Sequence, residues 1–378
     1  MGQSEAEQRI MDGSAWNDFC DELKEIGQLV FRPEVPADPF NRALGFRHLL
    51  RLLRGGIESA IDYADPQYPA FFRLADETKG VLNDNPDNYY ENCVIDGRFD
   101  YRITGKRGTV PWFSIGTKAS SGEVAGMVST GELDGTQIDF ADDGTFEIII
   151  SKNEQSGNWL PATDETRMAI VRQTFGDRKK EAISQLEIEC LNPERSNNTL
   201  EPGALEAQMK QALGFVASTT TLGIDWMQRY KTKHFNALPE DDQALCHAAG
   251  GDPNIHYYQS YWDLAPDQAL LVHLTDIPEC QTWNLQISDY WMESLDFRFF
   301  QISVNRFTAT YEEDGSVYVV ISERDPGPRY PNWLRTLGHG QGGMLGRYVG
   351  AKNPPREMAS TIVKVSELQS ASDGAAGS

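Results

Sequence analysis

Hydrophobic positions recur with helical spacing in two stretches of the chain. Between residues 40 and 63 apolar side chains stand at Leu44, Leu49, Leu52, Leu53 and Ile57, and several of these positions are three or four residues apart. Such steps place side chains on one face of an amphipathic helix. A similar pattern covers residues 202–230, where Pro202 stands near the expected helix N-terminus. Both stretches are predicted to be helical.

Further along the chain, the pattern changes to alternation after each helical stretch. Apolar residues stand at every second position in the runs 146–150 and 317–321. This period of two is typical of a β-strand. An Asp-Gly pair precedes each run, at 143–144 and 314–315, and glycine there can adopt the positive φ of a hairpin turn. We therefore expect antiparallel strands.

These patterns belong to an internal repeat, because six matches occur in the same order in both halves. The matched pairs are ALGF at 43–46 and 212–215, NPDNYY ending at Tyr90 and DPNIHYY ending at Tyr258, PWFSIG with Trp112 and TWNLQI with Trp283, DGTFEIIIS at 143–151 and DGSVYVVIS at 314–322, GNWLP with Trp159 and PNWLR with Trp333, and IVRQTFG with Arg172 and LGRYVG with Arg347. Their offsets drift only from 168 to 175 residues. The chain is predicted to be a tandem duplication.

Each repeat is expected to begin with helices and to continue as a β-sandwich. The predicted fold class is α+β, mainly β, with two tandem helix-led antiparallel β-sandwich units of jelly-roll-like type. The expected bounds are a first unit at 1–198 with its helical lead at 15–85 and its β part at 88–196, a second unit at 199–368 with its helical lead at 202–250 and its β part at 256–368, and a disordered polar tail at 369–378.

The β parts resemble a known family. From Trp283 to Tyr348 the chain reads WNLQISDYWMESLDF, then EEDGSVYVVIS, then DPGPRYPNWLRTLGHGQGGMLGRY. This stretch is similar to the bacterial domain-of-unknown-function family 1214, and the first unit, with DDGTFEIIIS and SGNWLP, resembles a more divergent copy. The resemblance covers roughly 100–196 and 270–368. It implies a β-rich fold in both units and transfers no catalytic residue.

The net charge of the chain argues against two classes of function. The 378 residues include 34 Lys and Arg against 56 Asp and Glu, a formal net charge of −22. This balance argues against nucleic-acid binding and against anionic membranes, since both require cationic surfaces. No run approaches the roughly 18 apolar residues that span a bilayer, and the N-terminal residues lack the pattern of a secretory signal. A cytoplasmic protein is expected.

No cofactor or metal motif is present. The five cysteines, Cys20, Cys93, Cys190, Cys246 and Cys280, lie far apart and are expected to be unpaired thiols. The six histidines form no HxH or HExxH arrangement, and no Walker, GxGxxG or GxSxG signature occurs in its required context. We expect neither a metal nor a cofactor, although a metal site assembled from distant residues is left open.

His339 and Asp325 are the candidate catalytic residues. Both lie in a loop of the second unit that is longer than its counterpart in the first unit, which has no histidine. An imidazole exchanges protons near neutral pH, and Asp325 would orient it. The alternative is that DPGPRYP and the glycines around His339 only form turns.

Six further residues are candidates for substrate binding. They are Tyr258, Trp291, Asp296, Asn332, Trp333 and Arg347. Aromatic side chains mixed with carboxylates suit a pocket for a ring-bearing ligand. They suit equally a core in which Trp and Tyr pack and a buried Arg finds an acidic or carbonyl partner. Asn332, Trp333 and Arg347 recur in the first unit, which favours the structural alternative for these three.

The functional expectation follows from these candidates. We expect a soluble enzyme that acts on a small neutral or hydrophobic organic substrate by acid–base chemistry, as a hydrolase or lyase. The alternative is a non-catalytic protein that binds a carbohydrate or another ring-bearing ligand. The expected partner is a small molecule, without nucleic acid or membrane, and a homo-oligomer is left open.

Overall fold

The strands form two sets, one in each half of the chain. The computed structural model describes residues 4–120, 127–194 and 200–376. Its first strand set consists of β1 (Asn88–Val94), β2 (Tyr101–Lys106), β3 (Trp112–Ser120), β4 (Met127–Asp134), β5 (Thr145–Ser151), β6 (Trp159–Pro161), β7 (Thr166–Thr174) and β8 (Gln185–Cys190). The second consists of β9 (Leu238–Pro239), β10 (Ile255–Asp263), β11 (Gln268–Leu274), β12 (Thr282–Ser288), β13 (Ser303–Asn305), β14 (Val317–Ser322), β15 (Trp333–Arg335), β16 (Gln341–Val349) and β17 (Glu357–Lys364).

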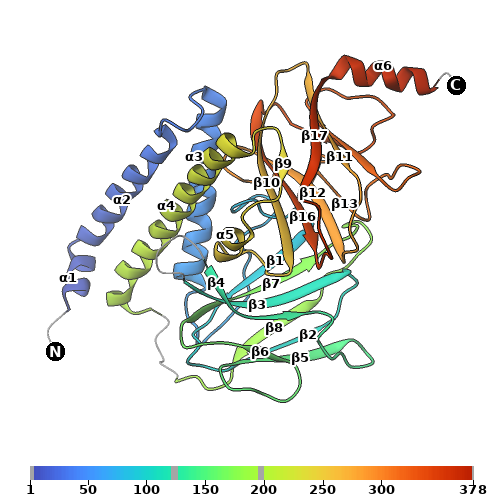
Figure 1. The fold of residues 1–378 in the computed structure, drawn as a ribbon. Helices are drawn as coiled ribbons and strands as arrows, with labels where there is room; N and C mark the ends of the chain where they lie inside the picture. Colours follow the sequence, from blue (N-terminus) through green and yellow to red (C-terminus); the bar gives the residue numbers. More distant parts are fainter. Residues whose placement is uncertain (1–3, 121–126, 195–199, 377–378) are drawn as a thin grey trace. The chain divides into compact units, whose positions relative to one another are not determined.

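The sheet topology repeats along the chain. The first set forms sheets of order β1-β7-β3-β4 and β6-β5-β2-β8, and the second forms β10-β16-β12-β13 and β15-β14-β11-β17-β9 (Figure 1). Adding nine to each strand number of the first set gives its counterpart in the second, and β9 is the additional strand. The pairs are antiparallel except β5 with β6 and β14 with β15. The predicted tandem duplication and the α+β, mainly β fold are thereby confirmed.

Each strand set encloses its own hydrophobic core between two sheets. In the second set, Trp283 and Tyr348 come from one sheet, and Val272 and Val319 from the other. In the first set, Phe113, Ile115 and Val171 face Ile103 and Ile148 in the same way. Gly144 and Gly315 both have φ of +81° in the turns before β5 and β14, which confirms the predicted Asp-Gly turns.

Helices precede both strand sets. They are α1 (Glu5–Met11), α2 (Ser14–Gly27), α3 (Pro39–Ile57) and α4 (Pro202–Lys233), with the short η1 (Gln28–Phe31), η2 (Glu58–Asp62) and α5 (Gln243–Ala248), and α6 (Val365–Ala376) follows the last strand. The side chain of Asp38 caps α3 by accepting from the Asn41 backbone N–H at 3.0 Å. Gly56 of α3 lies so close to α4 that a Cβ there would meet the Ala212 carbonyl oxygen at 2.8 Å. The cap accounts for the start of α3, and the close approach of the two helices requires glycine at position 56.

The chain divides into two units that are not contiguous in sequence. The first comprises Met1–Lys79, Asn88–Leu222 and Ala248–Gly250, and the second comprises Gly80–Asp87, Gly223–His247 and Gly251–Ser378. Residues 80–87 lie in the first half of the sequence, and the predicted boundary at 198 assigns them to the first unit. In the structure they group with the second unit.

The C-terminal tail corrects one expectation. Residues 369–376, predicted to be disordered, continue helix α6, whereas 377 and 378 lie outside the described residues. Val365 and Leu368 are buried against Ala269 and Val320. The first turn of α6 is therefore held by apolar contacts. The small polar residues of the tail gave no sign of them.

Candidate functional site

One face of the second unit's sheet β10-β16-β12-β13 is polar although it is buried. Along β12, Leu285 and Ile287 point into the core, while Asn284, Gln286 and Ser288 occupy the alternate positions. Arg347 of β16 pairs with Asn284, so it shares their face. A sheet face lined by buried polar side chains must satisfy them with hydrogen bonds.

Residues of the segment 80–87 provide these bonds. Asn83 accepts from the Ser288 hydroxyl at 2.8 Å and from Arg347 Nη2 through its backbone carbonyl at 2.5 Å. Its side-chain amide donates to Gln259 Oε1 at 3.1 Å. The segment thus bonds to three neighbouring strands of one sheet, and all four of these residues are buried.

Asp84 brings a carboxyl group into this arrangement. Its carboxylate accepts from the Ser294 backbone N–H at 3.0 Å, and its carbonyl accepts from Gln286 at 2.8 Å. Gln286 in turn accepts from Arg347. We call the buried residues Asn83, Asp84, Asn284, Gln286, Ser288, Glu293 and Arg347 the polar cluster.

Burial dominates the electrostatics of Asp84. Loss of hydration, and less strongly the nearby Glu293 carboxylate, raise the pKa of its carboxyl, while hydrogen bonds from Ser294 and the positive charge of Arg347 lower it. The net result is a rise from 3.8 to about 6. A carboxyl group with this pKa exchanges protons close to neutral pH, as general acids and bases do.

Asn284 contributes an acceptor that the protein does not use. Its amide group donates to Asn85 Oδ1 at 2.7 Å and to Asp87 Oδ2 at 3.2 Å, which fixes the orientation of the side chain. Its Oδ1 atom is buried and has no hydrogen-bond partner among the described residues. Since a buried unsatisfied acceptor is costly, it is a feature that needs an explanation.

The backbone around the cluster is strained. Leu82, Asn83 and Met292 have φ of +47°, +59° and +58°, in the left-handed region that non-glycine residues seldom adopt. The Asn83 N–H donates to the Met292 carbonyl at 2.7 Å, which joins the two strained segments. Such conformations concentrate at functional sites.

Further buried polar groups extend the cluster toward helix α5. Gln259 donates to Cys246 Sγ at 3.2 Å, and the thiol lies 3.5 Å from Asp241 Oδ2. Asp241 is paired with Arg229. Burial raises the pKa of the Cys246 thiol to about 12, so this cysteine is a neutral hydrogen-bonding group and not a nucleophile.

The first unit has a different set of side chains on the equivalent face. The pairing of Ser114 with Arg172 matches that of Asn284 with Arg347, and Arg172 donates to the Gly250 carbonyl at 3.1 Å. Lys118, at the position of Ser288, is buried and paired with Glu132. The two copies have therefore kept the arginine and exchanged its polar surroundings.

In the described residues, the two predicted catalytic residues, Asp325 and His339, have hydrogen-bond partners of their own. The exposed carboxylate of Asp325 accepts from the Gly327 N–H at 2.8 Å, and its carbonyl accepts from Gln369. His339 is half-buried on the turn between β15 and β16, where its N–H donates to the Thr336 carbonyl at 3.0 Å. Their catalytic role stays a prediction.

Asn332 and Trp333 make backbone contacts that recur in the first unit. Asn332 donates to the carbonyls of Thr310 and Tyr318, and the Trp333 indole donates to the Ser322 carbonyl at 3.0 Å. Asn158 and Trp159 make the corresponding bonds to Asp139, Glu147 and Ser151. These contacts support the structural alternative for both residues, and their role as ligand contacts stays a prediction.

The remaining predicted binding residues are dispersed. Tyr258 is fully buried in the core, with its hydroxyl donating to the Pro355 carbonyl. Trp291 is buried beside Tyr290, with ring centroids 5.6 Å apart, and Asp296 pairs with Arg298 at 2.7 Å. Among the six candidates, Arg347 is the one that the structure places in the polar cluster.

The other members of the cluster were not among the predicted site residues. The alternation of Asn284, Gln286 and Ser288 in TWNLQIS was a usable signal, since polar residues at every second position of an otherwise apolar strand mark a polar face. Asn83 and Asp84 had no such signal, because GVLNDNPD has the composition of an ordinary turn.

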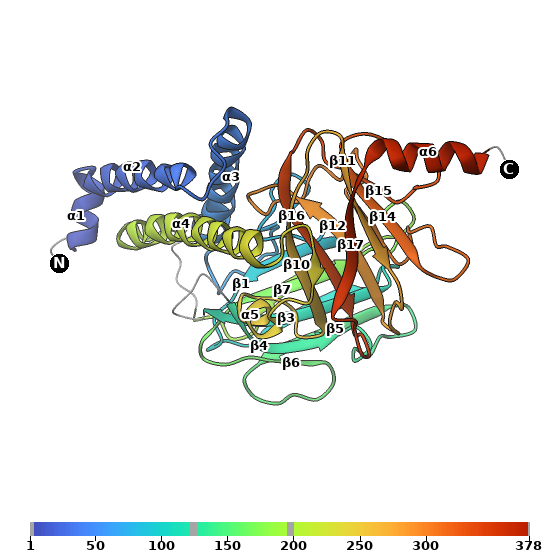
Figure 2. The same ribbon diagram turned by 45° about the horizontal axis from the view of Figure 1, so that its top comes forward.

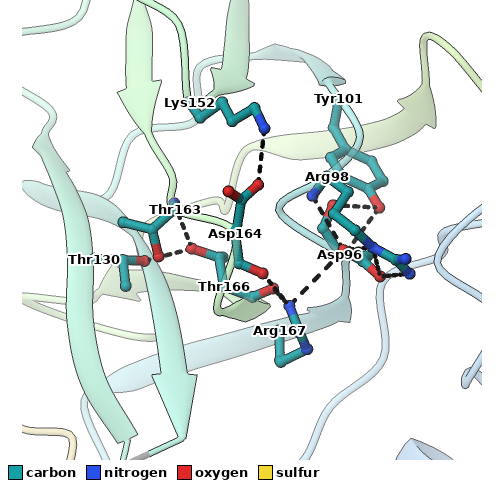
Figure 3. A network of polar contacts seen from close by, with 9 residues as sticks. All are labelled: Asp96, Arg98, Tyr101, Thr130, Lys152, Thr163, Asp164, Thr166 and Arg167. Atoms are coloured by element: carbon teal, nitrogen blue, oxygen red, sulfur yellow. Dashed lines mark hydrogen bonds and ion pairs between the residues drawn. The ribbon is translucent and has the colours of Figure 1, made fainter.

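A second polar network lies in the first unit (Figure 3). The Asp96 carboxylate forms ion pairs with Arg98 at 2.5 Å and with Arg167 at 3.8 Å. Lys152 forms an ion pair with Asp164 at 2.8 Å. The arginine and lysine side chains are exposed. Such surface ion pairs contribute little energy, so this network is a less suitable candidate.

Other features of the described residues add no stronger candidate. An open hollow of about 820 Å³ on the first unit's sheet β6-β5-β2-β8 includes Lys106, Glu147 and Asn158, of which Asn158 is engaged by the backbone bonds given above. In the whole described part of the chain, no group of three or more His, Cys, Asp and Glu side chains is placed to hold a metal ion. None of the helices in the described part of the chain has the length and apolar character to cross a bilayer.

Comparisons with known proteins place this chain in a family. The model of a family described as "Protein of unknown function (DUF1214)" matches residues 90–176, which lie in the first unit. The sequence motifs had indicated a stronger resemblance to this family in the second unit. The crystal structure of an uncharacterized protein from Burkholderia cenocepacia is similar, with a TM-score of 0.91 and 42% identity over 96% of this chain and 99% of that chain. The VPA0106 protein from Vibrio parahaemolyticus gives a TM-score of 0.48 and 10% identity over 84% of this chain and 97% of that chain. No curated protein matches. The chain therefore belongs to the same family as the Burkholderia cenocepacia protein, and its residues 90–176 match the DUF1214 family, with a sheet topology that recurs in the second unit.

Proposed function

We propose that the protein is an enzyme that performs acid–base chemistry on a small neutral organic molecule, as a hydrolase or lyase, at the polar cluster of its second unit. The supporting observation is Asp84, a buried carboxyl whose pKa is raised to about 6. Near neutral pH it holds or releases a proton readily, which suits general acid–base catalysis. The five cysteines form no disulfide, in line with a cytoplasmic location.

The neighbours of Asp84 have distinct roles in this proposal. Arg347 bonds to Gln286 and to the Asn83 carbonyl, so it is a positioning residue that holds the segment bearing Asp84 against the sheet. The unused Oδ1 of Asn284 would accept a hydrogen bond from a hydroxyl or amide of the substrate. The polar cluster contains two carboxyl groups, and its one arginine is bonded to Gln286 and Asn83. An anionic substrate would be repelled there, so a neutral one is favoured.

The test compares Asp84→Asn with the wild-type chain on a panel of small neutral esters, amides and hydroxy ketones, with product detection by mass spectrometry. We expect turnover by the wild type with a pH inflection near 6, and a loss of about 10²–10⁴-fold in the variant. Glu313→Gln, a change at an exposed carboxylate of the second unit, is the matched control and should retain activity.

Two outcomes would contradict the assignment of Asp84. Full activity of Asp84→Asn would exclude it as the proton-transfer group. Loss of activity in both His339→Ala and Asp325→Asn, with Asp84→Asn active, would move the chemistry to the loop before β16.

A non-catalytic binding protein for a carbohydrate is the second candidate, because Asn284 Oδ1 is an acceptor for a ligand hydroxyl with or without chemistry. Calorimetric titration with neutral monosaccharides separates the two candidates. Binding that Asn284→Ala weakens and Asp84→Asn leaves unchanged, without turnover of any compound in the panel, would favour the binding protein.

A further inference from the structure

Helix α3 has two apolar faces, and one of them is exposed. The buried face, with Leu44, Leu49 and Leu52, packs within the first unit. The other face carries Ala43, Phe46, Leu50, Leu53 and Ile57. Their spacing of three, four, three and four residues is that of a heptad seam, which normally packs against another helix.

This seam is open to solvent in the chain. Phe46 is 44% exposed and Leu50 is 69% exposed. Phe31, which is 53% exposed, extends the patch by stacking edge-on against Phe46 with ring centroids 5.9 Å apart. Adjacent exposed apolar side chains of this size mark an interaction surface.

The charges beside the seam select an acidic partner. Helix α3 carries Arg42, Arg47, Arg51 and Arg54 and no acidic residue, within a chain whose net charge is −22. Arg47 is exposed, and its side chain has no partner among the described residues. Two such helices would repel each other, which disfavours pairing of α3 with a second α3.

Helix α2 of the same chain has the complementary surface. It carries Asp18, Asp21, Glu22 and Glu25 against Lys24. Glu22 and Glu25 are exposed and lack side-chain partners among the described residues. Figure 2 shows α1 and α2 beside α4 and extending away from the strands of the first unit.

Apolar residues also follow α2 at heptad-like spacing. Trp16 is 62% exposed, and Phe19 and Leu23 are half-buried. The 14 residues of α2 span about 21 Å, and the seam of α3 from Ala43 to Ile57 has a similar length of about 21 Å. The two surfaces therefore match in length, apolar spacing and charge.

We infer that the helical lead of the first unit is a dimerisation surface, on which α2 of one copy docks against α3 of a second copy of this chain and the reverse. The same contact between α2 and α3 then occurs twice, as two-fold symmetry requires. Acidic α2 meets basic α3 in each, and the exposed seam is covered. This inference does not depend on the function proposed above.

Analytical ultracentrifugation of the full chain tests the dimer. The wild type should be dimeric, and Leu50→Glu should raise the dimer dissociation constant at least about tenfold, because an apolar anchor is replaced by a charge. Phe299→Glu is the matched control, since Phe299 is 73% exposed on the second unit. It should leave the dimer unchanged.

Charge reversal tests which helices meet. Glu22→Arg and Arg47→Glu should each weaken the dimer, and the double variant should restore it, because both pairs are then reversed together. A monomeric wild type, or a dimer that Leu50→Glu leaves intact, overturns the inference. Weakening by the single changes without rescue by the double change overturns the pairing of α2 with α3. Binding of a monomer to vesicles of phosphatidylglycerol would assign the seam to a lipid surface instead and would also overturn it.

Discussion

Asp84 has a carboxyl group whose negative charge is poorly accommodated by its surroundings. Its hydrogen bonds come from Ser294, and Arg347 lowers its pKa less than burial raises it. The resulting rise from 3.8 to about 6 corresponds to about 3 kcal/mol at roughly 1.4 kcal/mol for each pH unit. The group that supports the proposed chemistry is therefore a cost to the folded state.

This cost makes the stability of the protein depend on pH. Because the folded pKa is above the unfolded one, the protonated group favours folding below about pH 4, and this contribution is lost as pH rises through about 6. We expect Asp84→Asn to be more stable than the wild type at pH 7.5, by up to about 3 kcal/mol, and to show little difference at pH 4. Urea unfolding at both pH values measures this. An equal difference at the two values would contradict the raised pKa.

Arg347 illustrates what can be concluded from a residue alone. A partly buried arginine on an apolar strand requires an acidic or carbonyl partner. In the structure, Arg347 donates to the backbone carbonyl of Asn83 and to the side-chain amide oxygen of Gln286. The need for a partner followed from the residue type, whereas the identity of the partner, 264 positions away in the case of Asn83, did not.

At the level of elements, the strand register required the structure. Tyr90 pairs with Arg172, and Tyr257 pairs with Arg347, so Tyr257 and not Tyr258 is the counterpart of Tyr90. The sequence match was therefore displaced by one residue. Because side chains alternate between faces, such a displacement exchanges a core position for one on the opposite face.

The match between Trp112 and Trp283 is displaced in the same way. Phe113 directly follows Trp112 and occupies the core position of Trp283. Identity of residue type indicated the repeat correctly but not its register.

The segment 80–87 depends on a glycine at its start. A Cβ on Gly80 would lie 2.4 Å from Asp84 Oδ1 and 2.9 Å from the Glu293 Cα, closer than atoms approach without displacement. We expect Gly80→Ala to destabilise the protein by about 1–3 kcal/mol through overpacking, with reduced activity at the polar cluster. Thermal unfolding measures the first effect.

Gly214→Ala provides the control for this prediction. Gly214 lies in α4, and a Cβ there meets nothing within 4 Å. Alanine should stabilise the helix by up to about 1 kcal/mol. Equal effects of the two substitutions would show that the close approach at Gly80 is not real.

For the whole molecule, the formal net charge of −22 is the dominant electrostatic feature. Like charges on one folded chain repel each other, and salt screens this repulsion. Raising NaCl from 20 to 300 mM should therefore raise the Tm by a few degrees, about 3 °C. Differential scanning calorimetry measures this change. A fall in Tm would mean that screened ion pairs, such as that of Arg229 with Asp241, outweigh the repulsion.

Much of the architecture was predictable, while the candidate site largely was not. The helices around Leu49 and Leu213, the Asp-Gly turns and the duplication follow from short-range periodicity and from order along the chain. Of the predicted site residues, Arg347 is the one that belongs to the polar cluster. Its other members share no motif, because bonds such as that of Gln286 with Asp84 join residues 202 positions apart.

By itself, the sequence determined the elements, their repetition and the fold class, since hydrophobic periodicity and turn chemistry act over a few residues. Only the tertiary structure decided that residues 80–87 join the second unit and bring Asp84 to a polar sheet face. The physical reason is that burial, and with it the pKa of Asp84, is a property of the surroundings in space and not of neighbours along the chain.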